Sequence, residues 1–300
     1  MQIGLSAASH TVLDPSAGAA HLLARVRAAR DADLASLSFG DQHNVAGDSY
    51  FQNTPTLGRA LADWTGRPAG CLFLLPLWHP VLVAEHVGTL AALHDGPFIL
   101  QTGLGSGDQQ FAGMGQDLAE RATRFEEAAR MIRALLDGES VSSERFGVTD
   151  AAIGLQPATP VEWWIGAAAP VGLRRAARMG DAWYTGPGYT PTTIAEPLAL
   201  YREACDREGR TPRVMVRLDA TVSHDPSILQ AAREQVGRGY RGMSEAQLII
   251  GTPDEAVAQL APFAELGVDQ IVVRSMGVSP EADLETISGL ADVRASFAEA

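Results

Sequence analysis

The chain has 300 residues, 46% of them apolar, which is enough to bury a large core as one barrel or as two smaller domains. Its formal net charge of −13 argues against general nucleic-acid binding, because contacts with phosphates require a basic face. Every basic residue is Arg, so the sequence excludes a Schiff-base lysine and the lysine of a nucleotide-binding P-loop.

Membrane and metal signals are missing from the sequence. No apolar run approaches the length of a membrane span, and no charged stretch precedes an apolar one at the start of the chain. The two cysteines, Cys71 and Cys205, are far apart and form neither a CxxC motif nor a zinc-type spacing. We therefore expect a cytoplasmic protein in a reducing compartment, with no membrane contact and no metal.

Strand-like and helix-like segments alternate along the chain. Apolar runs typical of buried strands occur at residues 3–8, 34–39, 71–75, 98–104, 161–165, 182–185, 214–221 and 270–274. Segments of helical period lie at 17–31, 54–64, 81–94, 119–136, 172–179, 192–208, 228–237 and 254–266, with a closing helix at 283–298. This order predicts the α/β class and a single (β/α)8 TIM barrel, with residues 1–300 forming one domain.

Loops that follow the strands are the functional ones in such a barrel, because the strand C-termini all meet at one face. Two of these loops, residues 42–54 and 186–191, are active-site candidates. A long segment at 137–160 precedes a strand and is expected to be surface decoration or an oligomer contact. The residues expected at the strand ends are His10, Asp41, Gln42, His43, Trp78, His79, Gln101, Thr102, Gly103, Gly166, Ala167, Ala168, Thr185, Gly186, Arg217, Asp219, Arg274 and Ser275.

Residues 71–115 contain the most informative pattern. A buried strand is followed by a helix that begins at a His-Pro pair, and a second strand then ends in the glycine-rich residues 103–107. These glycines lack the GxGxxG spacing of a dinucleotide loop, but they would let the backbone approach a flat ring or a phosphate. Gln101 and Thr102, one of which must point inward, could hydrogen-bond heteroatoms of such a ring.

A second pattern, WWIGAAAPVGLRRAARMGDAW, occupies residues 163–183. Its small residues lie between a strand and a helix, where backbone N–H groups and the helix dipole favour a phosphate. The alternative interpretation is that residues 167–169 form only a tight turn. We favour phosphate binding.

Both patterns resemble the luciferase-like monooxygenase superfamily, which includes flavin-dependent monooxygenases and enzymes that use the deazaflavin coenzyme F420. The resemblance rests on the order and spacing of many residues, among them Pro76, His79, Pro80, Ala84, Glu85, Leu90, Leu93, Gly96, Gly103, Gly105, Phe111 and Gly115. The chain departs from the family pattern at Pro97, where Arg is common. The resemblance implies a luciferase-like barrel that holds a flavin-type cofactor across its C-terminal mouth.

The resemblance also implies roles for individual residues. His43 is the expected catalytic acid–base group, and the alternative is that it only hydrogen-bonds its loop. The expected cofactor contacts are Cys71, Leu72, Gln101, Thr102, Gly103, Gly105, Gly166, Ala167, Ala168 and Ala169. The expected substrate pocket comprises His10, Gln42, Tyr50, Phe51, Trp78, His79, Trp183 and Tyr189. A non-prolyl cis peptide, found in many relatives, would fall at Cys71-Leu72 or one residue later, and an ordinary trans strand is the alternative.

The preferred function is coenzyme F420-dependent hydride transfer to or from a small organic substrate. FMN-dependent monooxygenation of the bacterial luciferase type is the alternative, and it differs because the deazaflavin does not activate oxygen as a flavin does. Gln42 and Ala168 stand where relatives often have His and Ser, which leaves a third alternative, a non-catalytic flavin- or deazaflavin-binding protein. We expect a homodimer.

Overall fold

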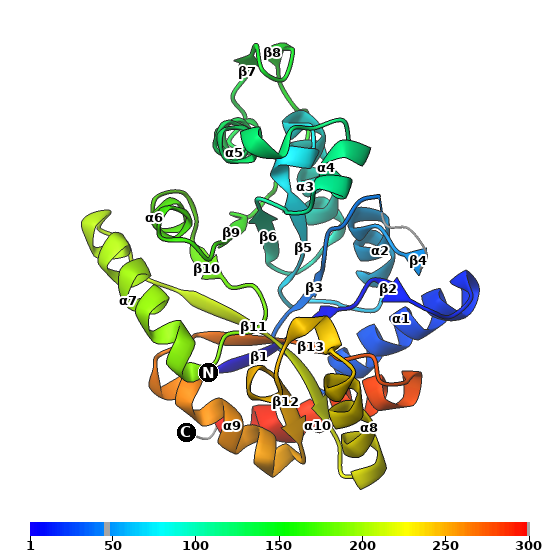
Figure 1. Cartoon of the computed structure of the whole chain (residues 1–300). Coiled ribbons are helices and arrows are strands. Elements are labelled where there is room, and N and C mark those ends of the chain that lie inside the picture. The colour runs from blue at the N-terminus through cyan, green and yellow to red at the C-terminus, as the bar shows by residue number, and fades with distance from the viewer. Residues whose placement is uncertain (45–48, 299–300) are drawn as a thin grey trace.

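The computed structural model describes residues 1–44 and 49–298. In these residues, eight parallel strands close into a barrel that helices surround (Figure 1). The barrel strands are β1 (Gln2–Ala7), β3 (Leu37–Phe39), β5 (Ala69–Leu74), β6 (Phe98–Gly103), β9 (Glu162–Gly166), β10 (Ala182–Tyr184), β11 (Val214–Val222) and β13 (Gln270–Ser275). They follow one another in chain order around the barrel, and β13 pairs with β1 to close it. The predicted (β/α)8 barrel is confirmed.

Helices cover the outside of the barrel, and many begin with a proline, whose fixed φ suits the first helical position. The long helices are α1 (Pro15–Asp31), α2 (Asn53–Ala60), α3 (Pro80–Leu93), α5 (Arg121–Leu136), α6 (Pro170–Met179), α7 (Pro191–Arg207), α8 (Pro226–Gly237), α9 (Pro253–Glu265) and α10 (Pro280–Ala298). The short ones are α4 (Asp108–Gly113) and the 3-10 turns η1 (Leu75–Leu77), η2 (Leu118–Glu120), η3 (Tyr240–Gly242) and η4 (Glu245–Gln247). In the described ranges, no helix is long and apolar enough to cross a membrane.

Five short strands are additional to the eight strands of the barrel in the described residues. At its C-terminal mouth, β2 (His10–Thr11) pairs antiparallel with β4 (Ser49–Tyr50). Residues 137–160 contain a two-stranded ribbon of β7 (Val141–Ser143) and β8 (Val148–Ala151). The sequence prediction missed β12 (Ile249–Gly251), which pairs with the end of β11, because its apolar run is short and follows an irregular segment.

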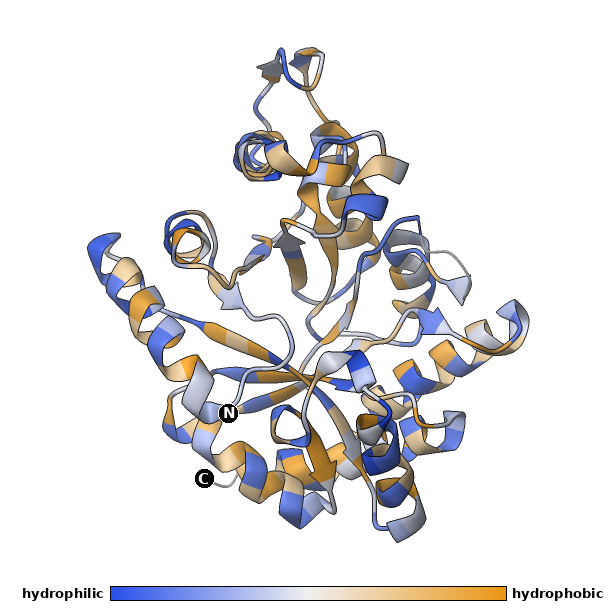
Figure 2. Ribbon diagram, viewed as in Figure 1, coloured by the Kyte–Doolittle hydropathy of each residue, from blue (hydrophilic) through white to orange (hydrophobic). Residues whose placement is uncertain are grey.

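Side chains of the barrel strands alternate between the interior and the helix-covered outer face. One small buried cluster lies inside the barrel and consists of Ile99, Trp164, Ala182, Tyr184, Met215 and Val272. Their neighbours along the strands, such as Leu100 and Phe73, belong to the main core beneath the helices. Figure 2 shows the apolar strands at the centre of the molecule and alternating apolar and polar residues along the surrounding helices.

The hypothesis of a cis peptide at Cys71-Leu72 or one residue later is wrong. The peptide bonds of the described residues are all trans. Cys71 and Leu72 lie within an uninterrupted parallel ladder with β6, in which Cys71 pairs with Leu100 and Leu72 with Gln101. This regular pairing leaves no bulge in β5.

Gly70 on β5 offers a test of how tightly the barrel is packed. A Cβ atom at this position would overlap the backbone carbonyl oxygen of Ile99 on β6, and a backbone atom cannot rotate away. We expect Gly70→Ala to lower the free energy of unfolding by about 1–3 kcal/mol, the usual cost of overpacking. Urea denaturation would measure it. Gly237→Ala is the matched control, because open space surrounds that glycine at the end of α8, and it should be neutral or slightly stabilising. Equal losses in both variants would contradict the prediction.

Candidate functional site

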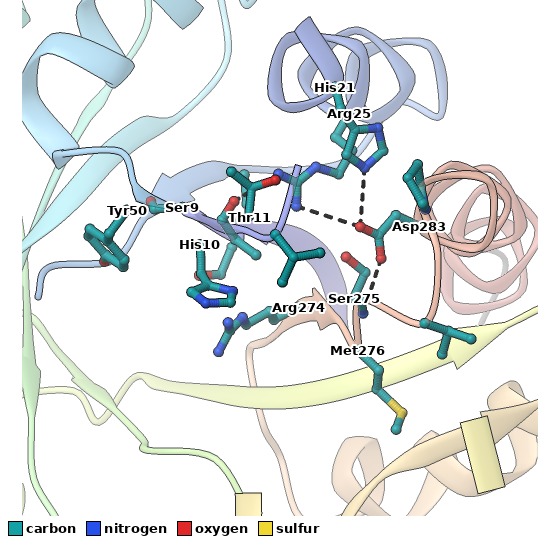
Figure 3. A pocket seen from close by; sticks show the side chains of 18 of the residues that line it. Ser9, His10, Thr11, His21, Arg25, Tyr50, Arg274, Ser275, Met276 and Asp283 are labelled. Carbon is teal, nitrogen blue, oxygen red and sulfur yellow. Dashed lines mark hydrogen bonds and ion pairs between the residues drawn. The ribbon is translucent and has the colours of Figure 1, made fainter. Parts of the chain in front are cut away.

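A cavity of about 820 Å³ opens at the C-terminal mouth of the barrel. Its wall is built from the strand ends of β1, β3, β11 and β13 and from the loops that follow them. The residues that line it include Ser6, Ser9, His10, Arg25, Asp41, Gln42, Tyr50, Leu72, Arg217, Tyr240, Arg241, Arg274 and Asp283. Figure 3 shows His10 and Arg274 pointing into this space from two different strands.

The strand register decides which expected cofactor contacts face the barrel interior. Leu72 pairs with Gln101, and Gln101 pairs with Trp164 of the interior cluster, so Leu72 and Gln101 point inward. Cys71 belongs to the core beneath the helices, and Thr102 accepts a hydrogen bond from Trp163 Nε1 at 2.8 Å on that same outer face. Of these inward residues, Leu72 lines the cavity, and Gln101 lies fully buried beside it on the neighbouring strand.

Asp41 joins the ends of β3 and β5 at the floor of the site. Its carboxylate is fully buried, and Oδ2 accepts hydrogen bonds from the Leu74 backbone N–H at 2.7 Å and from Trp78 Nε1 at 2.8 Å. Oδ1 lies 3.1 Å from His43 Nε2, in contact but not aligned as a hydrogen bond. Catalytic contacts of this kind often align only when a ligand binds. Asp41 can therefore orient the imidazole of His43.

His43 is held on three sides. Its backbone N–H donates to Gln110 Oε1 on α4 at 2.8 Å, and its ring meets Trp78 edge-on at a centroid distance of 5.4 Å. The side chain is 11% exposed and lies beside the lining of the large cavity. This placement makes His43 a fixed group at the edge of the site.

Tyr50 and His10 face each other across the β2–β4 pair, and both line the cavity. Burial, assisted by the charge of Asp41, raises the pKa of Tyr50 to about 12. The phenol therefore keeps its proton at neutral pH and can donate a hydrogen bond to a ligand.

A group of charged residues on β11, β13 and η3 forms the opposite wall. Asp219 Oδ1 accepts a hydrogen bond from Arg217 Nη2 at 2.8 Å. Asp219 Oδ2 accepts from Tyr240 Oη at 2.9 Å and from Arg241 Nη1 at 3.1 Å. Burial alone would raise the pKa of Asp219, but Arg217, Arg274 and Arg241 outweigh it and hold the pKa below its ordinary value. Asp219 is therefore an ionised, fully buried anchor.

A further charged group closes the rim between α1 and α10. Arg25 donates to the Ala8 carbonyl at 2.8 Å, and its guanidinium lies 3.8 Å from Asp283. Asp283 also lies 3.2 Å from His21 Nε2 and accepts the Gly277 backbone N–H at 3.1 Å (Figure 3). These contacts fix the loop that follows β13.

The glycine-rich and small-residue loops lie outside the lining of the large cavity. Gly105 and Gly107 have φ values of +69° and +90°, which favour glycine. Helix α6 begins after Ala169 with no side chain capping it, and a Cβ on Gly172 would press against Ala167. The expected contacts Gly103 and Gly166 are the last residues of β6 and β9, and Ala168 lies in the loop that follows β9. The described residues thus place these loops next to, and not inside, the cavity.

The remaining expected pocket residues have mixed placements. Trp183 is fully buried, and its Nε1 donates to the Ala167 carbonyl at 2.9 Å, so it supports the loop before α6 from below. Tyr189 packs against Trp183 at a centroid distance of 6.1 Å. Phe51 is half-buried against the core, and His79 precedes α3 with its ring 6.2 Å from Phe146. Their contact with a substrate stays a prediction.

Sequence reasoning missed Tyr240, Arg241, Arg25 and Asp283 as site residues. The first two follow α8 in the segment GRGYRG, and the other two lie on helices, so none of them stands at a strand end. The described residues contain no group of three or more His, Cys, Asp or Glu side chains that could hold a metal ion.

A parallel barrel with a polar cavity at its strand C-termini defines the class of (β/α)8 barrel enzymes. The family model for luciferase-like monooxygenases matches residues 1–244. The chain belongs to the luciferase-like monooxygenase family, as its sequence patterns predict, and it is an oxidoreductase.

Named relatives and solved structures agree with this assignment. The chain is 27% identical over 270 residues to the F420-dependent glucose-6-phosphate dehydrogenase of Beutenbergia cavernae, covering 77% of this chain and 79% of that protein. It is 25% identical over 237 residues to the enzyme of the same name from Kribbella flavida, covering 68% and 71%. The fold is similar to that of an F420-dependent secondary alcohol dehydrogenase, at 16% identity, a TM-score of 0.82 and coverage of 98% and 99%. It is also similar to the monooxygenase RslO1 of Streptomyces bottropensis, at 18% identity, a TM-score of 0.81 and coverage of 99% and 100%.

Asp219 supplies a prediction that depends on pH. Asp219→Asn would leave the surrounding arginines without their shared counter-charge, and we expect it to lower the free energy of unfolding by about 3–5 kcal/mol at pH 7. Because the folded-state pKa of Asp219 is depressed, its contribution is complete above about pH 4 and is lost as the pH falls through that folded value. The difference between the two proteins should therefore shrink in acid.

Urea denaturation of both proteins at pH 7 and at several acidic pH values measures this difference. Asp254→Asn, which removes an exposed carboxylate at the start of α9, serves as the control and should have a small effect. A difference at Asp219 that stays constant or grows below pH 4 would contradict the electrostatic role.

Proposed function

We propose that this protein is a coenzyme F420-dependent oxidoreductase that transfers hydride to or from a small organic substrate. The observation that carries the proposal is the inward pair Leu72 and Gln101 at the base of the mouth, next to the Asp41–His43 contact. The named F420-dependent relatives, which match most of this chain, support the choice of coenzyme. The proposal agrees with the function that the sequence predicts.

Two inward residues support the placement of a flat heteroaromatic ring at the mouth of the barrel. Gln101 Nε2 is buried and has no hydrogen-bond partner among the described residues, so it can donate to a ring heteroatom. Leu72 supplies apolar surface on the adjacent strand. The loops of residues 103–107 and 166–169, with their small side chains and the start of α6, are where we place the phosphate of the coenzyme.

The coenzyme supplies the hydride chemistry at its central ring when it is bound. His43, oriented by Asp41, then exchanges a proton with the substrate, since imidazole is a common acid–base group in catalysis. Tyr50 and His10 line the cavity and hold the substrate by hydrogen bonding.

FMN-dependent monooxygenation is the second candidate, and the fold similarity to monooxygenases favours it. A non-catalytic binding protein is the third, because Gln42 and Ala168 stand where relatives often have His and Ser. We also propose that residues 1–300 act as one domain and as a homodimer in the cytoplasm. Leu82 and Leu93, exposed by 48% and 67% on α3, support association of two copies.

Coenzyme binding tests the proposal directly. We expect the purified protein to bind coenzyme F420 with micromolar affinity, which the fluorescence of the deazaflavin reports, and to bind FMN more weakly. Turnover with a panel of alcohols, aldehydes, imines and enones should proceed without oxygen consumption. Oxygen-dependent product would favour the FMN-dependent reaction, and binding of neither cofactor would overturn both.

His43 tests the mechanism. We expect His43→Ala to lower turnover by roughly 10²–10⁴-fold, the usual contribution of a placed acid–base group, and to remove the limb of the pH–rate profile that reports imidazole ionisation. Affinity for the coenzyme should change much less, because the phosphate is assigned to other loops. His224→Ala, which removes an exposed histidine after β11, is the control. Nearly full turnover in His43→Ala would move the role to His10, His79 or the coenzyme alone.

A further inference from the structure

Arg274 on β13 is a half-buried cation that lines the cavity without a hydrogen bond or ion pair to any other described residue. Burial lowers the pKa of its guanidinium, the positive charges of Arg217 and Arg241 lower it further, and Asp219 acts in the opposite direction. A buried charge normally has a partner, because desolvation is costly. Among the described residues, no carboxylate oxygen pairs with the guanidinium of Arg274.

Asp219 cannot supply that charge, although the strand register places it directly beside Arg274. Its Oδ1 is taken by Arg217, and its Oδ2 is taken by Tyr240 and Arg241. Arg217, meanwhile, keeps a buried Nε–H without a partner in the described part of the chain. Two neighbouring guanidinium groups thus have donors left over.

The other carboxylates of the cavity wall are also engaged. Asp41 Oδ2 is held by Leu74 and Trp78, and its Oδ1 lies against His43. Asp283 is held by Arg25, His21 and the Gly277 backbone N–H. Among the described residues in and just behind the wall, four arginines face three aspartates. This wall is a positive site in a chain whose formal net charge is −13.

We propose that Arg274 and Arg217 form a subsite for an oxyanion, a carboxylate or phosphate group carried by the substrate. Arginine suits this ligand because its planar fork donates two parallel hydrogen bonds to such a group. The subsite lies on the β11–β13 side of the cavity, whereas the loops assigned to the coenzyme phosphate lie outside its lining. Assigning the oxyanion to the substrate rests on the proposed function.

This geometry also orients the substrate. With its oxyanion held at Arg274, the rest of the molecule extends across the cavity past His10, whose ring points into the same space (Figure 3), toward Leu72 and Asp41. The reacting carbon then lies at the end of the cavity where the ring of the coenzyme is placed. Neutral compounds of the same shape would lack this anchor.

Titration of inorganic phosphate into the protein without coenzyme, followed by calorimetry at low ionic strength, tests the subsite. We expect Arg274→Gln to weaken phosphate binding at least tenfold. Arg274→Lys, which keeps the charge but not the fork, should weaken it less. Arg59→Gln, which removes an exposed arginine on α2 that pairs with Asp63 and does not line the cavity, is the control and should bind phosphate like the parent protein.

Thermal unfolding without phosphate separates a ligand-binding role from a structural one. Because Arg274 is unpartnered and repelled by its neighbours, Arg274→Gln should unfold at the same temperature as the parent protein or at a higher one. A lower unfolding temperature would show that Arg274 has a structural partner and would overturn the proposal. Phosphate binding that is absent in the parent protein, or unchanged in Arg274→Gln, would also overturn it.

Coenzyme F420 affinity, measured by fluorescence on the same variants, identifies the source of the oxyanion. Unchanged affinity in Arg274→Gln supports the substrate as its carrier, and a parallel loss of coenzyme binding would overturn that assignment. If the parent protein binds phosphate through Arg274 but binds no coenzyme, the oxyanion subsite stands and the proposed function fails.

Discussion

The pleat of the closed barrel is the constraint on which the site depends. In a strand, successive side chains face opposite sides, and closure of the sheet turns one side into an interior that is sealed except at its mouth. Leu72, Gln101, Arg217 and Arg274 share the inward register, whereas Cys71 and Thr102 belong to the outer core. A shift of one residue in any strand would exchange these two sets. The chemistry of the mouth is therefore fixed by the pairing of the backbone.

Within that interior, charge is organised around two buried carboxylates with different functions. Asp41 bonds to backbone and indole N–H groups, and so it connects two strand ends and leaves one oxygen toward a histidine. Asp219 instead faces guanidinium groups and a phenol, which keep it ionised. The first stabilises a loop, and the second sets the sign of the electrostatic potential on its side of the cavity. The arginines thus gather on the β11–β13 side of the mouth, and Asp41 and His43 lie at the ends of β3 and β5.

The sequence was sufficient to predict the fold because strand-like and helix-like segments alternate clearly along it. Most of the predicted elements overlap the observed ones. It was less informative on β12, whose three residues are too few to produce a period. For the site, strand-end reasoning found His10, Arg217, Asp219 and Arg274, because those residues follow directly from the barrel topology. It could not find Tyr240 and Arg241, because an irregular segment brings them to Asp219 across the sequence. Trp183 was expected in the substrate pocket because it stands at a strand end. Its side chain instead belongs to the main core, since alternate residues of a strand face the helices.

The joint between β10 and β11 has a consequence for the dynamics of the barrel. Trp183 and Tyr184 on β10 pair with the first residues of β11, whereas β13 pairs with β11 all the way from Met215 to Ala220. Beyond the end of β10, Thr185 bonds to Met215 and Arg217 on that edge of β11, and β12 joins the edge near Ala220. The seam is thus the least secured joint between neighbouring barrel strands, and local opening with amide hydrogen exchange would begin there. Since the loop before α6 rests on Trp183, a ligand that orders this loop would also slow the opening of the seam.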